Sequence, residues 1–218
     1  MKLQAVGRCV LIIMVVVAAR AAGPMQVRAQ VAADPTPIAR AQADSARNPW
    51  TTADVRFISG MIPHHAQAIQ MARWAATHGA SAQIQTLAGR IINAQQDEIA
   101  VMQHWLRDRR QPVPEARATG MRMAMDGMEH DMLMPGMLTE DQMRRLDQAR
   151  GAEFDRLFLS LMIQHHQGAV SMVKELLANE GAAHDDTIFK LAADINVDQT
   201  TEIARMQQLL AALLFEAP

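Results

Sequence analysis

Apolar side chains recur every three or four positions along four segments of the chain, which is the spacing of an amphipathic helix. The segments cover residues 52–77, 81–106, 139–178 and 185–214. Ser81 precedes the second segment as an N-cap, and Thr139 with Gln142 three residues later has the form of a capping box. Gly79 follows the first segment, where a left-handed residue commonly ends a helix. The pattern therefore predicts an all-α fold.

The helical pattern is duplicated. Residues 57–72 (FISGMIPHHAQAIQMA) match residues 158–173 (FLSLMIQHHQGAVSMV) at a constant offset of 101 (158 − 57). The helices that follow also match, at an offset of 104 (188 − 84). Each half is therefore predicted to form a helical hairpin, over 51–107 and 139–216. Two such hairpins pack naturally as a four-helix bundle with one long crossover.

The crossover over residues 108–138 breaks the helical pattern with Pro112, Pro114, Gly120, Gly127, Pro135 and Gly136. It carries seven methionines within 17 residues (137 − 121 + 1), together with one histidine. They are Met121, Met123, Met125, Met128, Met132, Met134 and Met137, with His130. Their spacing shows no consistent helical or strand period, so no regular element is predicted here. Two interpretations stay open: the crossover docks its methionines on the bundle, or it presents them to a ligand.

The N-terminal residues 1–29 have the pattern of a secretory signal peptide. Lys2 and Arg8 are the basic residues, and 9–19 is an apolar run too short to span a bilayer. Small residues follow, so we expect cleavage after position 21 or 29 and a periplasmic or secreted protein without stable membrane association. A retained membrane anchor is the alternative. Residues 30–50, rich in Ala, Pro and polar residues, are expected to form a flexible linker.

Removal of residues 1–29 changes the charge of the chain. The full sequence has 21 basic and 23 acidic residues, and the N-terminal segment holds four of the basic ones. The mature chain therefore carries 17 (21 − 4) basic and 23 acidic residues, a net charge of −6, which argues against a nucleic-acid partner. The single cysteine, Cys9, is also removed. Disulfides and thiolate metal sites are thereby excluded, and any soft ligand must be methionine or histidine.

Polar side chains fall inside the apolar face of the predicted helices, at duplicated positions. On the first helix of each hairpin they are His64, His65, His165 and His166, with Met61 and Met162 one turn earlier; on the second they are Gln95, Glu98, Gln199 and Glu202. Antiparallel pairing about each turn places His64 opposite Gln95 and Met61 opposite Glu98, and the second hairpin is equivalent. A buried carboxylate without a partner is costly, so both glutamates should have partners. Gln67, by contrast, falls on the polar face.

This constellation favours metal binding over a purely structural core. Four imidazoles, two amides and two carboxylates in one small core are an expensive structural choice. We predict that the histidines, Met61 and Met162 bind the metal, and that the amides and carboxylates orient the imidazoles from behind. Imidazole and thioether without thiolate favour Cu(I) over Zn or Mg, with Cu(II) and silver(I) also compatible. Outside this set, Met71, Met102, Met172 and Met206 are expected to be packing residues, and His78, His104 and His184 to be surface residues.

Three motifs carry a resemblance to a known family. They are M-I-P-H-H at 61–65, F-D-R-L-F-L-S-L-M-I-Q-H-H-Q-G-A at 154–169, and M-P-G-M at 134–137 followed by Thr139. The chain resembles domain-of-unknown-function family 305, which includes CopM-like periplasmic copper-binding proteins, over about residues 50–214. The resemblance implies a ferritin-like four-helix bundle, export, and a role in copper binding or tolerance. The helices lack the Glu-x-x-His pattern of ferritin-like di-iron proteins, which argues against di-iron oxidase chemistry.

We therefore predict a periplasmic protein without enzymatic activity that sequesters or carries Cu(I), and also Cu(II), for tolerance or homeostasis. The methionine-rich crossover would be a second or exchange site. The expected partners are the metal ion and other periplasmic copper-handling proteins. Two alternatives remain at this stage. One is a metal-dependent oxidase that uses the same core, and the other is a metal-free structural or stress-response bundle.

Overall fold

The computed structural model describes residues 36–40, 43, 50–125 and 128–215. The expected signal peptide lies outside the described residues, as does most of the expected linker, within which residues 37–40 and 43 are helical. The described part of the chain is mostly helical, which confirms the predicted fold class at that level. None of the helices in these ranges is both long enough and apolar enough to pass through a bilayer.

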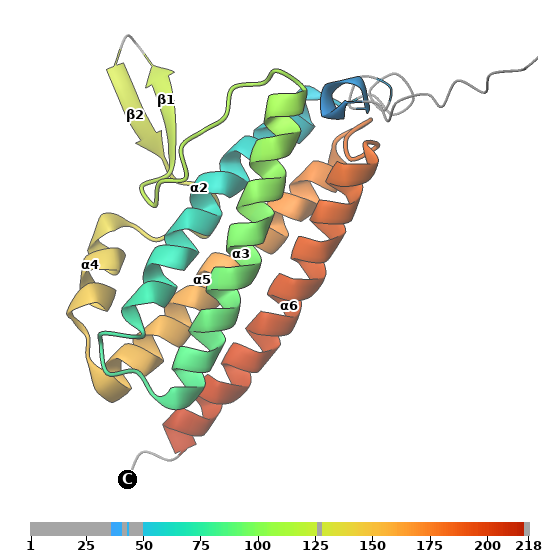
Figure 1. The fold of residues 1–218 in the computed structure, drawn as a ribbon. Helices are drawn as coiled ribbons and strands as arrows, with labels where there is room; N and C mark the ends of the chain where they lie inside the picture. The colour runs from blue at the N-terminus through green and yellow to red at the C-terminus, as the bar shows by residue number, and fades with distance from the viewer. Residues whose placement is uncertain (1–35, 41–42, 44–49, 126–127, 216–218) are drawn as a thin grey trace, which may run out of the picture. The chain divides into compact units, whose positions relative to one another are not determined.

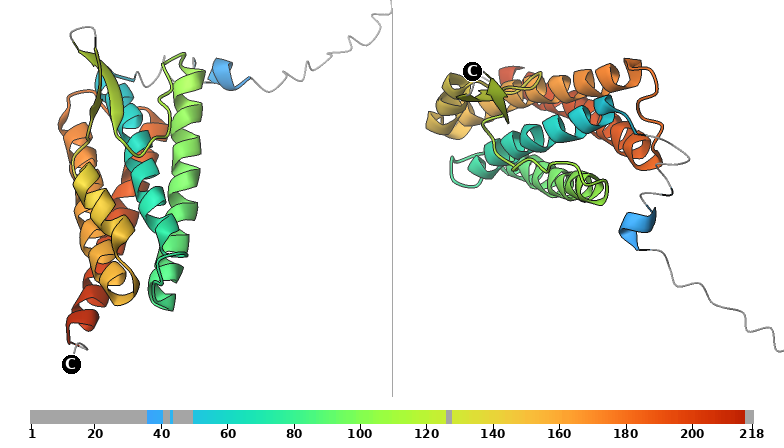
Figure 2. Two further views of the ribbon diagram at one scale, coloured as in Figure 1. Left: turned by 90° about the vertical axis from the view of Figure 1, so that its left-hand side faces the viewer. Right: turned by 90° about the horizontal axis from the view of Figure 1, so that it is seen from above.

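Four long helices form two hairpins. They are α2 (Thr52–Trp74), α3 (Ala82–Asp108), α5 (Gly151–Ala178) and α6 (Asp186–Phe215). Helix α2 packs along α3, α5 packs along α6, and α2 also contacts α5, so the two hairpins meet through their first helices (Figure 1). Figure 2 shows the hairpins as two layers. The N-caps agree with the sequence prediction. Ser81 caps α3, and Thr139, which precedes a further short helix, forms the predicted capping box with Gln142.

The predicted helix over 139–178 is two helices. The short α4 (Glu140–Gln148) ends before Ala149 and Arg150, whose backbone is extended, and α5 starts anew at Gly151 with a φ of 56°. Only glycine adopts such a φ readily, so this residue allows the chain to turn between the helices. Leu146 and Ala149 are buried at the turn. Helix α4 thereby packs across α2 and α5 instead of extending the bundle.

The crossover contains a β-hairpin, which the sequence pattern did not predict. Strand β1 (Met121–Met125) pairs antiparallel with β2 (Met128–Met132). The register places Met121 opposite Met132, Met123 opposite His130 and Met125 opposite Met128. The methionines and His130 therefore occupy positions of one parity, on one face of the ribbon. The sequence did carry this signal, because methionine alternates over 121–125 and Asp-Gly, a favoured hairpin turn, follows.

The buried apolar side chains form two clusters with a polar layer between them. On α2, residues 57–62 belong to one cluster and residues 68–75 to the other, and His64 and His65 lie between them. On α5 the same division falls at His165 and His166. The polar layer therefore crosses the middle of the bundle, where apolar side chains enclose it along the helix axes.

Candidate metal centre

The four duplicated histidines are completely buried, as the sequence predicted. They lie where α2 and α5 meet. The ring centroids of His64 and His165, one from each hairpin, are 3.9 Å apart with 43° between the ring planes. The ring centroids of His64 and His65 are 6.2 Å apart, and those of His165 and His166 are also 6.2 Å apart. The duplication thus brings four imidazoles from two helices into one cluster.

The hydrogen bond of His64 defines which ring nitrogen is free. His64 Nε2 lies 3.0 Å from the carbonyl oxygen of Pro135. A carbonyl oxygen can only accept, so Nε2 carries the proton and donates it. In a neutral imidazole the lone pair is then on Nδ1. His64 Nδ1 is buried and has no hydrogen-bond partner among the described residues. The free nitrogen is therefore the one that could bind a metal.

Two partly exposed glutamates contact the second histidine of each pair. His65 Nε2 lies 2.7 Å from Glu98 Oε2, and His166 Nε2 lies 2.7 Å from Glu202 Oε2. The prediction that these carboxylates have partners is confirmed. Glu98 was expected opposite Met61, but it contacts His65, which lies one helical turn further along α2. The His166 contact has hydrogen-bond geometry, so Glu202 accepts from Nε2–H and Nδ1 carries the lone pair, whereas His65 and Glu98 are at ion-pair distance without an aligned hydrogen bond. Imidazoles that bind metals commonly have such an acceptor on their other nitrogen.

Several polar atoms in this layer have no partner in the described part of the chain. They are Nδ1 of His64, His65 and His166, both ring nitrogens of His165, both amide atoms of Gln95, and Oε1 of Gln199; Nε2 of His65 has no hydrogen bond either, although Glu98 is at ion-pair distance. Gln95 and Gln199 are 2% and 3% exposed, so water does not reach them freely. Buried polar atoms are normally paired, and a cluster of exceptions indicates a bound group. Imidazole nitrogens can bind a metal ion directly, and amide groups can form hydrogen bonds around it, so these side chains fit a metal ion.

Burial keeps the imidazoles of His64 and His165 neutral. Loss of solvation lowers the pKa of His64 from 6.5 to about 3, and the neighbouring His65 adds to the effect. Burial likewise holds the pKa of His165 well below its usual range, with His64 and His166 contributing. Protons therefore do not compete for these rings at neutral pH, and the neutral ring is the form that binds metals.

The donors are gathered but not arranged as a finished metal site. In residues 50–125 and 128–215, no three or more His, Cys, Asp or Glu side chains take up the arrangement of a metal site. The tilted contact of His64 with His165 shows why, since the two rings pack on each other.

Residues 134–138 of the crossover cover the α2–α5 contact. Gly136 lies directly on Gly168 of α5, where a Cβ atom on Gly168 would stand 2.0 Å from the carbonyl oxygen of Pro135. Gln67 of α2 fastens the crossover on both sides of the β-hairpin: its amide donates to the carbonyls of Ala118 (2.9 Å) and Leu138 (3.1 Å), and its oxygen accepts from Leu138 N–H (2.6 Å). Gln67 was predicted on the polar face, and it is buried because the crossover covers that face.

The candidate methionines fall into three groups. Met61 and Met162 are completely buried in the apolar clusters that flank the histidines. Met137 is buried and its sulfur accepts from the N–H of Met134 at 3.4 Å. Met132 is 42% exposed. The hairpin positions Met121, Met123, Met125, Met128 and His130 are placed by backbone register. The crossover therefore docks through residues 134–138, while the hairpin is a separate element. The four methionines expected to pack, Met71, Met102, Met172 and Met206, are all buried.

His78, predicted at the surface, is buried. Its Nε2 contacts the carbonyl oxygen of Asp147 at 2.9 Å, and its own carbonyl accepts from Gly151 N–H at 2.8 Å. It thus joins the end of α2 to the α4–α5 turn, an element that the sequence did not indicate. His104 and His184 are exposed, as predicted.

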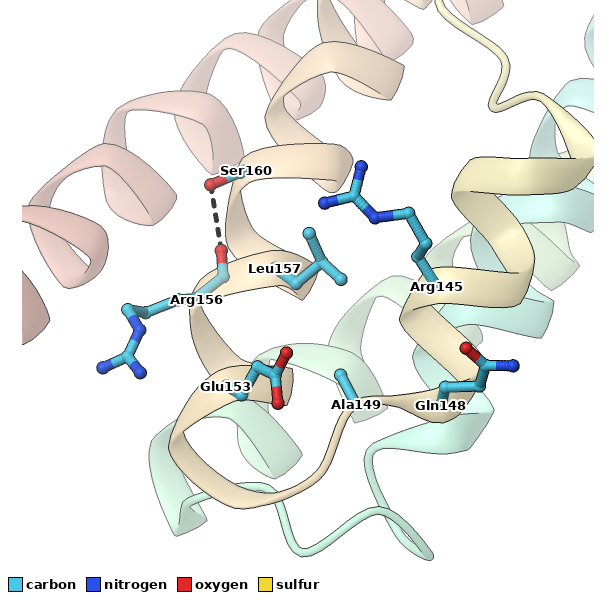
Figure 3. Close-up of a pocket in the computed structure, with 7 residues that line it drawn as sticks. All are labelled: Arg145, Gln148, Ala149, Glu153, Arg156, Leu157 and Ser160. Atoms are coloured by element: carbon cyan, nitrogen blue, oxygen red, sulfur yellow. Dashed lines mark hydrogen bonds between the residues drawn. The ribbon is translucent and has the colours of Figure 1, made fainter.

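A surface hollow between α4 and α5 is not part of this centre (Figure 3). It is lined by Arg145, Gln148, Ala149, Glu153, Arg156, Leu157 and Ser160. Two guanidinium groups border it, so a cation would be repelled there.

Comparison with known proteins identifies relatives. The family described as Domain of unknown function (DUF305) matches residues 54–210. A DUF305 protein of Streptomyces coelicolor, described as secreted, is 28% identical with a TM-score of 0.62, over 74% of this chain and 93% of that chain. CopM in the Cu(I)-bound form is 33% identical with a TM-score of 0.55, over 75% of this chain and 97% of that chain. CopM has also been solved in Cu(II)-bound and Ag-bound forms. An uncharacterised protein of Acanthamoeba polyphaga mimivirus is 40% identical over 57 residues, which span 38% of its length.

Proposed function

This chain belongs to the DUF305 family, and from that premise we propose that it is an exported protein that sequesters or carries copper, as Cu(I) and as Cu(II). One observation carries the proposal: four completely buried imidazoles gather in one layer, and each has a ring nitrogen without a partner in the described part of the chain. The copper-bound and silver-bound forms of CopM support the same chemistry in a relative of similar fold.

The proposed ligands are the Nδ1 atoms of the histidines and the sulfur atoms of Met61 and Met162. Pro135 holds His64 through Nε2, and Glu98 and Glu202 contact His65 and His166. The hydrogen bonds of His64 and His166 leave the lone pair of each ring on Nδ1. Copper is the cargo, and the absence of cysteine among the mature residues leaves imidazole and thioether as the soft donors.

The β-hairpin is proposed as a second site, specific for Cu(I). Its register pairs Met121 with Met132, Met123 with His130 and Met125 with Met128. Five methionines and one histidine thus occupy positions of one parity on a short ribbon, and thioether and imidazole are soft donors. Met134 and Met137, which dock with residues 134–138, belong instead to the cover of the core.

The wider biological context follows from the same proposal. The bundle is of the ferritin-like kind, with the methionine-rich crossover between its hairpins. Residues 1–29 direct export, and a relative described as secreted supports this placement. The metal is then exchanged with other copper-handling proteins of the periplasm.

Titration of the purified protein with Cu(I) against a competing chelator tests the proposal. His64→Ala with His165→Ala should abolish the tightest site, whereas His104→Ala with His184→Ala, which changes two exposed histidines, should leave it intact. The helical fold should survive both changes because alanine is a good helix former. Equal stoichiometry and affinity in all three proteins would refute the histidine site.

A further inference from the structure

A groove of about 530 Å³ runs between α3 and α6, on the side of the bundle opposite the crossover. Figure 1 shows α4 and the β-hairpin beside α2, with α3 and α6 on the other side. The groove is lined by the acidic residues Asp97, Glu98, Asp186, Asp194 and Asp198, by Lys190, and by Ala94, Val101, Thr187 and Leu191. Lys190 pairs with Asp194 on the same helix. Five carboxylates against one ammonium group make the groove strongly negative.

Of the two carboxylates that contact the histidines, Glu98 lines the groove, and Glu202 lies one helical turn beyond Asp198, which also lines it. The side chains of Glu98 and Glu202 are 14% and 20% exposed, while the imidazoles of His65 and His166 behind them are fully buried. Each carboxylate thus has one side toward solvent and the other on an imidazole. Burial, followed by the charges of Glu98, Glu202 and Asp194, raises the pKa of Asp198. These carboxylates are therefore close together, with too little positive charge nearby to balance them.

Unpartnered amides continue the polar path inward. Gln95 lies three residues before Glu98 on α3, and Gln199 lies three residues before Glu202 on α6. Residues three apart share a helix face, so each amide follows its carboxylate toward the histidine layer. Both side chains are more than nine-tenths buried, and the two amide atoms of Gln95 and Oε1 of Gln199 bond to no residue in the described part of the chain.

The opposite side of the histidine layer is closed. The carbonyl of Pro135 occupies His64 Nε2, and Gly136 is in backbone contact with Gly168. Apolar clusters close the layer along the helix axes. The α3–α6 groove, by contrast, is lined by polar residues, among them Glu98, which contacts His65.

We propose that this groove is the route by which the metal reaches the histidines, and that it selects ions of net positive charge over neutral or anionic metal complexes. The inference rests on the proposed copper binding. The groove attracts the hydrated cation toward Glu98, next to the layer in which the unpartnered Nδ1 atoms of the histidines lie. Electrostatic attraction of this kind raises association rates by roughly 10- to 1,000-fold, and salt weakens it.

Stopped-flow mixing of the full chain with aqueous Cu(II), followed by quenching of tryptophan fluorescence, tests the route. Asp194→Asn with Asp198→Asn should slow association about tenfold at low salt and flatten its salt dependence, with copper stoichiometry unchanged. A second variant, Asp97→Asn with Asp198→Asn, keeps the Lys190 pair and should behave in the same way. The matched control, Glu140→Gln with Glu153→Gln, changes the charge equally at the N-termini of α4 and α5.

The outcomes separate the two proposals. Slower association in both groove variants and not in the control supports the route. Equal rates in all proteins, or equal slowing in variants and control, overturns the route while copper binding stands. A parent protein that binds no Cu(II) at equilibrium overturns the proposed function itself.

Discussion

Asp54 and Asp155, which stand 101 residues apart (155 − 54) and are equivalent in the duplication, make the same connection in opposite directions. Asp54 in α2 accepts from the N–H of Ala183, in the turn of the second hairpin, at 2.7 Å. Asp155 in α5 accepts from the N–H of Ser81, in the turn of the first hairpin, at 3.2 Å to each oxygen. Both carboxylates are buried. The two hairpins are therefore fastened to each other at both ends of the α2–α5 contact.

Removal of either carboxylate should loosen the bundle. Asp155→Ala leaves a buried N–H without its acceptor and should lower the free energy of unfolding by roughly 1–3 kcal/mol. Asp54→Ala should cost more, because Asp54 also accepts from the N–H and hydroxyl of Thr51 at the start of α2. Urea unfolding measures both. Asp141→Ala, which removes an exposed pair with Arg144, should change stability by less than about 1 kcal/mol. An effect of Asp155→Ala as small as that control would contradict the fastening role.

The contact of Gly136 with Gly168 should be intolerant of a methyl group. Gly168→Ala places Cβ against the carbonyl of Pro135, so it should displace residues 134–138 and destabilise the protein by roughly 1–3 kcal/mol. Gly89→Ala is the matched control, since its Cβ meets nothing within 4 Å on α3. It should stabilise by about 0.5–1 kcal/mol, because glycine is unfavourable inside a helix. Gly168→Ala should lower the midpoint temperature of thermal unfolding, and Gly89→Ala should raise it. Equal effects of the two changes would show that the crossover is not tightly docked.

Acid should destabilise the metal-free protein through the buried histidines. In the fold, the pKa of His64 is lowered to about 3 and that of His165 is also well below 6.5. The unfolded chain takes up these protons near pH 6.5 and the folded chain does not, so the stability present above pH 6.5 is lost as the pH falls. The two groups together should cost on the order of 2–3 kcal/mol between pH 6.5 and 5. Urea unfolding at both pH values checks this against His64→Gln with His165→Gln, whose loss should be clearly smaller. An equal loss in both proteins would place the acid sensitivity elsewhere.

Replacement of the hairpin methionines should lower Cu(I) capacity selectively. The variant changes Met121, Met123, Met125, Met128 and Met132 to Leu and keeps Met134 and Met137, which dock on the bundle. Thioethers need no deprotonation, so this capacity should persist near pH 5, where imidazole ligands of ordinary pKa begin to be protonated. Competition titration at neutral pH and near pH 5 measures it. Parent-like Cu(I) capacity at both pH values would show that the hairpin is no metal site, and loss of Cu(II) binding would show that the core had been disturbed.

Local sequence signals predicted the long helices and the burial of the histidines. Helical periodicity and caps such as Ser81 depend on neighbours a few residues away, and the duplication showed that His64 and His165 occupy equivalent places. Glu98 and Glu202 were expected to have partners because a buried charge requires one. The predicted position of Glu98 along the bundle was wrong by one helical turn, because ideal antiparallel pairing ignores the length of the side chain.

The crossover is where prediction failed, because its contacts are distant in sequence. Gln67 and His78 look like surface residues on their own helices, and they are buried only because residues 134–138 and the α4–α5 turn cover them. The β-hairpin was within reach of prediction, since methionine alternates before an Asp-Gly turn. Gly151, a single residue with a left-handed backbone, marks the break of the expected long helix.

Pulsed electron paramagnetic resonance of the full chain with one equivalent of Cu(II) tests the central claim most directly. Thioethers bind Cu(II) poorly, and a coordinated imidazole reveals itself through its remote ring nitrogen. The parent and His104→Ala with His184→Ala should both give this imidazole signal. The signal should be lost when His64, His65, His165 and His166 are all changed to Ala. A parent without imidazole modulation, or the same modulation in the fourfold variant, would contradict copper binding by the buried histidines.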